Sequence, residues 1–214
     1  MKSVRIYRYR WIVLLALMLV IMASEMQWLA LAPISRVAAV FYGNQVVPNS
    51  LLGPDLLPLL HFVIFLLISI PAAYIVDWIG LKNTLRTSSL LLIGFGLMKG
   101  FYADALILVI VAQVGLSVAH TFILNSVAAL TSRWFPLRER GFAIGLVLLA
   151  QYLGLLLVMI VSPLAVVSNP QLPNYGEGLV PLLFWLGIAT AIVATAALFL
   201  FRENPPTPSS SEPF

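Results

Sequence analysis

Glu25 and Trp28 are the residues in this sequence whose types and spacing point most directly to chemistry. Glu25 lies inside an apolar stretch long enough to cross a membrane, where a charge costs at least ~2.5 kcal/mol. Trp28 follows three residues later and therefore shares a helical face with Glu25. An indole face attracts a quaternary ammonium, and a carboxylate supplies the counter-charge. The charge of Glu25 must be offset by a proton, a partner or a ligand, and the pair would fit an organic cation, with Glu25 as counter-ion or proton carrier.

Polar side chains from two later apolar segments are expected at a similar depth. Gln113, Ser117 and His120 are spaced so that they share one face of a helix. Gln151 and Tyr152 lie near the middle of the next segment. Because a polar group that faces lipid is costly, groups gathered at one depth favour a substrate-binding cavity or a pathway.

Plainer interpretations remain open for most of these residues. Trp28 is also typical of an interfacial anchor, because tryptophan is enriched at membrane boundaries. His120 is equally compatible with a hydrogen bond to a neighbouring helix, and Gln151 and Asn125 favour such bonds over ligand contacts. Glu25 is the residue that packing alone explains least well.

The composition requires a membrane around these segments. Hydrophobic residues make up 61% of the 214 residues and charged residues 9%, whereas soluble domains carry about 25% charged residues. The chain has no cysteine, which excludes disulfides and thiolate metal sites. The formal net charge of +4 does not predict nucleic-acid binding, since the basic residues flank apolar segments.

Six segments are apolar enough to cross a membrane, which takes about 20 residues. They are Trp11–Pro33, Leu56–Val76, Leu85–Phe101, Ala105–Leu130, Phe142–Val166 and Val180–Phe201. We therefore predict an all-α membrane protein in which residues 1–202 form one bundle of six transmembrane helices. Residues 203–214 are rich in Pro and Ser and predict a disordered tail.

The basic residues predict how these helices cross the membrane. Alternating loops place Arg36 and Lys99 on one side of the membrane. The other side receives the remaining basic residues, which are Lys2, Arg5, Arg8, Arg10, Lys82, Arg86, Arg133, Arg138, Arg140 and Arg202. Cytoplasmic loops carry the excess of Lys and Arg, so both termini of this multi-pass cell-membrane protein are predicted to be cytoplasmic. The first apolar run is too long for a signal-peptide core and is interpreted as a retained helix.

Two loops on the predicted cytoplasmic side carry motifs. Asp77, Gly80 and Lys82 form a short turn in which glycine permits a tight join of two helices. An acid there can accept hydrogen bonds from the N-terminus of a neighbouring helix. An ordinary polar loop is the alternative.

The second motif, "SRWFPLRERGFAIGL", joins the fourth and fifth segments. It contains Arg138 and Arg140, and Gly141 and Gly145 have a spacing that permits close helix packing in lipid. The arginines also satisfy the positive-inside pattern without any further role.

Both motifs resemble those of the major facilitator superfamily, in its N-terminal six-helix half. Asp77-x-x-Gly80-x-Lys82 resembles the superfamily's loop motif, and "RWFPLRERGFAIGL" resembles the link between spans four and five. The sequence departs from the usual motif at Ala73, where glycine is common, and at Trp78, where arginine is common. The resemblance implies two three-helix repeats and a gating role for Asp77, Gly80, Lys82, Arg138 and Arg140.

A narrower resemblance is to the feline leukaemia virus subgroup C receptor-related branch, whose substrates include choline and related amines. Gln27-Trp28, Phe122-Ile123-Leu124-Asn125 and "RENPPTP" match that branch, while His120 and Thr121 replace its glutamine and proline. This resemblance implies that Gln27 joins the substrate-binding residues, and that the first and fourth helices line a central cavity.

The expected function is secondary transport of a small organic solute by alternating access, and a cation of the choline or amine type is the favoured solute. Six spans supply one bundle, so a second six-helix half is expected as a homodimer or a separate chain, with membrane lipid around both. The alternative is a non-transporting or truncated half that acts as a subunit. No enzyme motif, cofactor or metal site is predicted.

Overall fold

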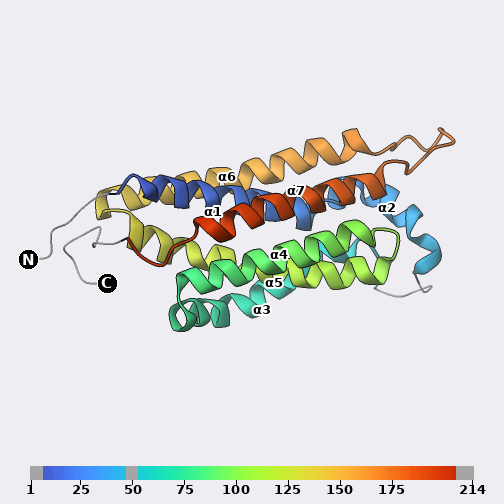
Figure 1. Ribbon diagram of the computed structural model, residues 1–214. Coiled ribbons are helices and arrows are strands. Elements are labelled where there is room, and N and C mark those ends of the chain that lie inside the picture. Colours follow the sequence, from blue (N-terminus) through green and yellow to red (C-terminus); the bar gives the residue numbers. More distant parts are fainter. Residues whose placement is uncertain (1–6, 47–52, 206–214) are drawn as a thin grey trace, which may run out of the picture.

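The structure describes residues 7–46 and 53–205, and all the regular secondary structure within them is helical. In this computed structural model six long helices follow one another within those ranges (Figure 1). They are α1 (Tyr9–Leu29), α3 (Leu56–Ile79), α4 (Leu81–Phe101), α5 (Leu106–Trp134), α6 (Leu137–Ala165) and α7 (Leu179–Leu200). Each coincides with one predicted span, which confirms the all-α six-helix bundle. Residues 206–214 of the predicted tail lie outside the described residues.

The helices form one elongated bundle in which α1 begins and α7 ends at the same end (Figure 1). α1 packs against α5, α6 and α7, while α4 lies between α5 and α7 and α3 packs on α5. The Tyr9 hydroxyl donates a hydrogen bond to the Leu200 carbonyl at 2.9 Å, which joins the first helix to the last. At the opposite end, α1 is followed by the short turn Ala32–Ile34, by α2 (Ser35–Phe41) and by the turn Gly43–Gln45.

Five of the described helical segments are long and apolar enough to cross a membrane, and α4 is not among them. α4 is less apolar because it carries Lys82, Arg86 and Lys99. Its position between α5 and α7, rather than its own composition, places it in the bundle.

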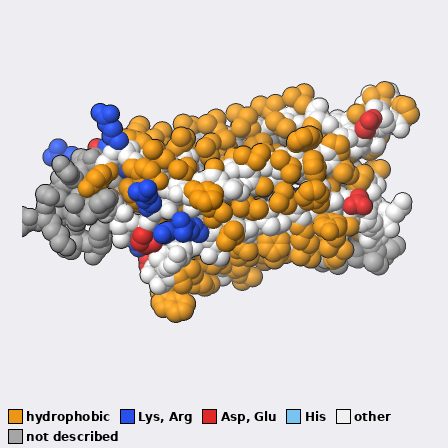
Figure 2. Space-filling model, viewed as in Figure 1, with side chains coloured by type: hydrophobic (Ala, Val, Ile, Leu, Met, Phe, Trp, Pro, Cys, Tyr) orange, Lys and Arg blue, Asp and Glu red, His pale blue; other side chains and the backbone are white. Residues whose placement is uncertain are grey.

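The outer surface has the character of a lipid-facing surface. Figure 2 shows hydrophobic side chains along the length of the visible face, whereas Lys and Arg side chains gather at the end where α1 begins and α7 ends. Among the five candidate spans, α5 buries the largest share of its length, and α3 and α6 bury the smallest shares. α3 and α6 therefore present much of their surface to lipid or to another bundle.

The glycines that bring helices together are not the pair that the sequence favoured. A Cβ atom added at Gly141 or Gly145 would meet nothing within 4 Å, so the predicted close packing at this pair is wrong. The close approach lies further along α6, at Gly154, where an added Cβ would stand 2.6 Å from the Met22 carbonyl oxygen of α1. Gly154 therefore allows the α6 and α1 backbones to touch beside Glu25.

Candidate functional site

Glu25 is buried in the bundle and faces polar groups from its own helix and from two others. Its side chain is 2% exposed. Trp28 Nε1 donates to the Glu25 Oε2 atom at 2.6 Å, and His120 Nε2 from α5 lies 3.4 Å from Oε1. Gln151 from α6 also reaches this carboxyl group. The structure thus gathers Glu25, Trp28, His120 and Gln151, as their common depth predicted.

His61 of α3 belongs to the same cluster, although no sequence pattern singled it out. Its ring is stacked on the Trp28 ring, with centroids 4.0 Å apart and planes 4° apart, and its side chain is 3% exposed. His61 Nδ1 lies 3.0 Å from the Ser117 hydroxyl. The available signal was composition, because the chain has just 2 histidines and both of them lie inside predicted spans.

The environment of Trp28 differs from both sequence interpretations. Trp28 is buried within the bundle, which argues against an interfacial anchor. The His61 imidazole covers one face of its ring, and the Phe62 ring approaches it edge-on at 5.5 Å. The ring is therefore enclosed by aromatic neighbours from α3 instead of lining an open cavity.

Lys99 is wrongly predicted as a loop residue. It lies in the last turn of α4 with its side chain fully buried, and its Nζ donates to the Gln27 carbonyl at 2.6 Å and to Gln113 Oε1 at 2.8 Å. Gln113 Nε2 in turn donates to the Trp28 carbonyl at 2.9 Å, and Gln27 Nε2 donates to Thr190 Oγ1 at 3.1 Å. Gln27 and Gln113 therefore join helices beside the cluster.

Tyr152 is the predicted site residue that the structure separates from this group. Its side chain is 66% exposed and lies on the outer surface of α6, unlike that of the neighbouring Gln151. A groove of about 350 Å³ on the described surface lies between α4 and α5 and is lined by apolar side chains, among them Phe95 and Val118. That groove does not include the polar cluster.

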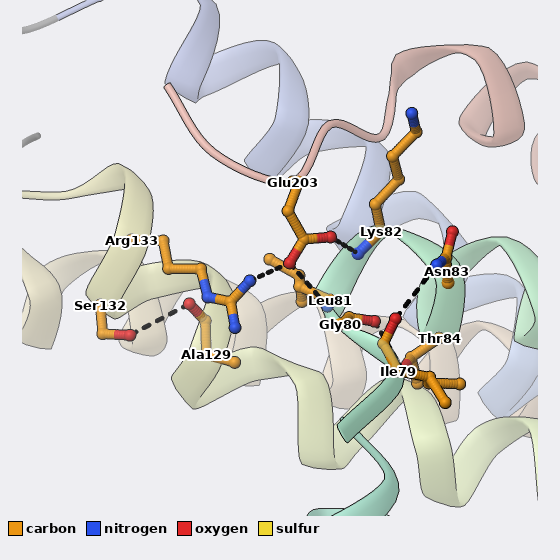
Figure 3. A network of polar contacts seen from close by, with 10 residues as sticks. All are labelled: Ile79, Gly80, Leu81, Lys82, Asn83, Thr84, Ala129, Ser132, Arg133 and Glu203. Carbon is orange, nitrogen blue, oxygen red and sulfur yellow. Dashed lines mark hydrogen bonds and ion pairs between the residues drawn. The ribbon is translucent and has the colours of Figure 1, made fainter. Parts of the chain in front are cut away.

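A second polar network lies at the end of the bundle where α1 begins and α7 ends (Figure 3). Gly80 joins α3 to α4 with a φ of 87°, a conformation that favours glycine. The Glu203 carboxylate accepts from the Leu81 and Lys82 backbone N–H groups, at 3.1 and 2.7 Å, and pairs with Arg133. An acid thus accepts hydrogen bonds at a helix N-terminus as expected, but the acid is Glu203.

The other residues with a predicted gating role lie around this network. Asp77 and Arg138 are exposed. Arg140 donates to the Ser132 and Phe135 carbonyls at 3.0 and 3.2 Å and so caps the end of α5. The gating role of Asp77, Gly80, Lys82, Arg138 and Arg140 stays a prediction.

The family of the chain follows from a comparison with known proteins. The family model described as Major Facilitator Superfamily matches residues 13–214, which includes nearly all of the bundle. The chain belongs to the Major Facilitator Superfamily. This establishes a membrane protein of a transporter family and confirms the resemblance seen in the loop motifs.

Curated relatives in this superfamily include members of the branch that the sequence resembles. Solute carrier family 49 member A3 of Xenopus tropicalis is 30% identical over 222 residues, covering 98% of this chain and 43% of that protein. The choline/ethanolamine transporter FLVCR2 of Homo sapiens is 24% identical over 212 residues, covering 98% of this chain and 39% of that protein. The chain spans less than half the length of these relatives.

A solved structure supports the superfamily fold. The inward-facing, unoccupied crystal structure of a bacterial homologue of the human lysosomal transporter Spinster matches with a TM-score of 0.72 at 15% identity. The match covers 97% of this chain and 46% of that chain. The bundle therefore has the fold of part of a larger major facilitator protein.

Proposed function

We propose that this chain is one six-helix half of a secondary transporter for a small organic cation of the choline or ethanolamine type. The observation that carries the proposal is the buried Glu25 carboxylate, hydrogen-bonded to the Trp28 indole. Among the ion pairs of the described residues, none joins Glu25 to an Arg or Lys side chain. A buried carboxylate without a fixed cation is suited to a cationic ligand.

The relatives support this class of substrate. FLVCR2 of Homo sapiens is named a choline/ethanolamine transporter, and so is flvcr2a of Danio rerio, which is 26% identical over 216 residues. In our proposal Glu25 supplies the counter-charge and Trp28 the ring face, with His120 and Gln151 beside them. Since His61 covers one face of Trp28, an ammonium group has to use the other face or displace the imidazole.

Alternating access requires a second bundle around the same site. In our proposal the exposed surfaces of α3 and α6 face that second half, which is a second copy or a separate chain. The alternative is a non-transporting or truncated six-helix half that acts as a subunit with a partner. Native mass spectrometry in lipid nanodiscs distinguishes them: a dimer of this chain supports a complete cavity, whereas a monomer favours a subunit awaiting a partner.

Binding of choline to the purified chain in lipid nanodiscs tests the site itself. We expect Glu25→Gln to weaken choline binding at least tenfold, while the uncharged isostere 3,3-dimethylbutanol is little affected. Trp28→Phe should weaken choline binding less than Trp28→Ala, because a smaller ring still attracts the cation. Glu177→Gln, at an exposed acid in the α6–α7 loop, is the matched control. Equal losses for choline and its uncharged isostere would reject the cation site.

A further inference from the structure

The hydrogen bonds of Ser24 determine which nitrogen of His120 carries hydrogen. The Ser24 hydroxyl donates to the Ile21 carbonyl at 2.8 Å, and the same oxygen lies 2.8 Å from His120 Nδ1. A hydroxyl group has one proton, so the Ser24 oxygen must accept from the ring, and Nδ1 carries hydrogen. In a neutral imidazole the other nitrogen, Nε2, is then an acceptor.

Nε2 of His120 faces a second acceptor. It lies 3.4 Å from Oε1 of Glu25, and both side chains are 2% exposed. Oε1 has no hydrogen-bond partner among the described residues, whereas Oε2 accepts from Trp28. Two buried acceptors that face one another are unfavourable unless a proton lies between them.

We propose that Glu25 and His120 form a proton-binding site, in which one proton lies between Glu25 Oε1 and His120 Nε2 and is exchanged for the cationic ligand. The proton converts one of the two acceptors into a donor, either as an imidazolium beside a carboxylate or as a carboxylic acid beside a neutral imidazole. In both forms the pair carries no net charge. This lowers the cost of placing Glu25 inside the membrane.

The neighbouring ionisable groups limit the site to a single proton. His61 of α3 stands 5.1 Å from His120, ring centroid to ring centroid. Nδ1 of His61 also faces a serine, Ser117, and the Ser117 hydroxyl donates to a carbonyl of α5 at 2.7 Å. The Ser117 oxygen therefore accepts from the ring, and His61 too carries hydrogen on Nδ1. On α4 the buried cation is Lys99. The neighbouring group on α6 is the uncharged Gln151, and α7 has no ionisable side chain. Additional positive charge beside Lys99 and His61 is disfavoured.

The exchange step rests on the proposed cation site, whereas the proton site does not. An ammonium group that approaches Glu25 supplies the positive charge that the proton supplied, so the proton leaves to water and the charge of the site is unchanged. Because the two cations exclude one another, choline binding tightens about tenfold for each pH unit while the site is protonated.

Spectroscopy of the ligand-free chain in lipid nanodiscs tests the proton site. The chain has 2 histidines, so ¹⁵N-histidine labelling gives ring-nitrogen signals from two imidazoles, each with its own Nδ1 and Nε2, and His61→Gln shows which signals belong to His120. Near neutral pH we expect either a proton on His120 Nε2 or an infrared signal of a protonated carboxyl group that Glu25→Gln removes and Glu177→Gln retains. If His120 is neutral with hydrogen on Nδ1 alone and no such carboxyl signal exists, the proposal is overturned.

Adding choline to the same sample tests the exchange. The exchange is supported if choline releases a proton into weakly buffered solution and the shared-proton signal is lost. Choline binding at an affinity independent of pH, without proton release, overturns the exchange. If the proton signal is present and choline does not bind at any pH, the cation site is rejected while the proton site stands.

Discussion

Glu203 and Glu25 both accept hydrogen bonds from the protein, and they are stabilised in opposite ways. Glu203 accepts from two backbone N–H groups at the start of α4 and pairs with Arg133, at a partly exposed position. Glu25 lies fully inside the bundle, accepts from Trp28, and has the ionisable partner His120 at 3.4 Å.

In our proposal, this difference separates a structural acid, Glu203, from a functional one, Glu25. The groups around Glu203 are permanently positive or permanently donating, because an Arg guanidinium stays charged and backbone N–H groups cannot leave. At Glu25, in our proposal, the charge is balanced by a proton or a ligand, both of which can leave the site. We therefore expect changes at Glu203 to affect stability and changes at Glu25 to affect binding.

The largest effect on stability is expected at Gly154, which allows α6 to reach the Glu25 cluster. In Gly154→Val the new Cβ would stand 2.6 Å from the Met22 carbonyl oxygen, so the two backbones must separate. We expect a loss of about 3 kcal/mol or more in the free energy of unfolding, measured in bicelles. Gly145→Val is the control, because its Cβ meets nothing within 4 Å, and comparable losses for both would contradict the close approach.

A smaller effect is expected at Lys99, which supports the same cluster without contacting the acid. Lys99→Met leaves the Gln27 carbonyl and Gln113 Oε1 without their buried donor. This should cost about 2 kcal/mol of unfolding free energy. Lys82→Met is the control, because Lys82 contacts Glu203 through its backbone N–H and not through its ammonium group. This variant should change the unfolding free energy by less than about 0.5 kcal/mol. A neutral effect of Lys99→Met would show that this lysine does not join the helices.

The smallest effect is expected at the terminal network. Glu203→Gln removes the charge from the hydrogen bonds to α4 and from the pair with Arg133, which should cost about 1 kcal/mol and less at high salt. Asp77→Asn, an exposed acid near the same turn, should stay within about 0.5 kcal/mol of the parent chain. A larger loss for Asp77→Asn than for Glu203→Gln would reverse our assignment of the helix-capping acid.

Much of the fold could be predicted because the membrane simplifies the pattern. Long apolar runs bounded by polar loops give the helices and their order, and Gly80 gives the tight turn between α3 and α4. The pairing of helices could not be predicted, as Gly141 and Gly145 show. Their spacing is suited to close packing, but which face of a helix meets a neighbour depends on the other five helices.

The candidate site was partly predictable for a related reason. Glu25 is conspicuous because a carboxylate in an apolar run demands a partner. His61 and Lys99 were missed because a single histidine or a lysine near a helix end has ordinary explanations. Their roles emerged once α3 and α4 placed them beside Trp28 and Gln113.

The sequence by itself determined that this chain is a helical membrane protein with an acid at membrane depth, because hydropathy and helical spacing are local properties. Tertiary structure alone decided which groups complete that acid's surroundings. Ser24, His61 and His120 come from three helices, and the position of each proton among them depends on distances of a few ångströms. Such distances are set by packing between segments far apart in the chain, which no local pattern records.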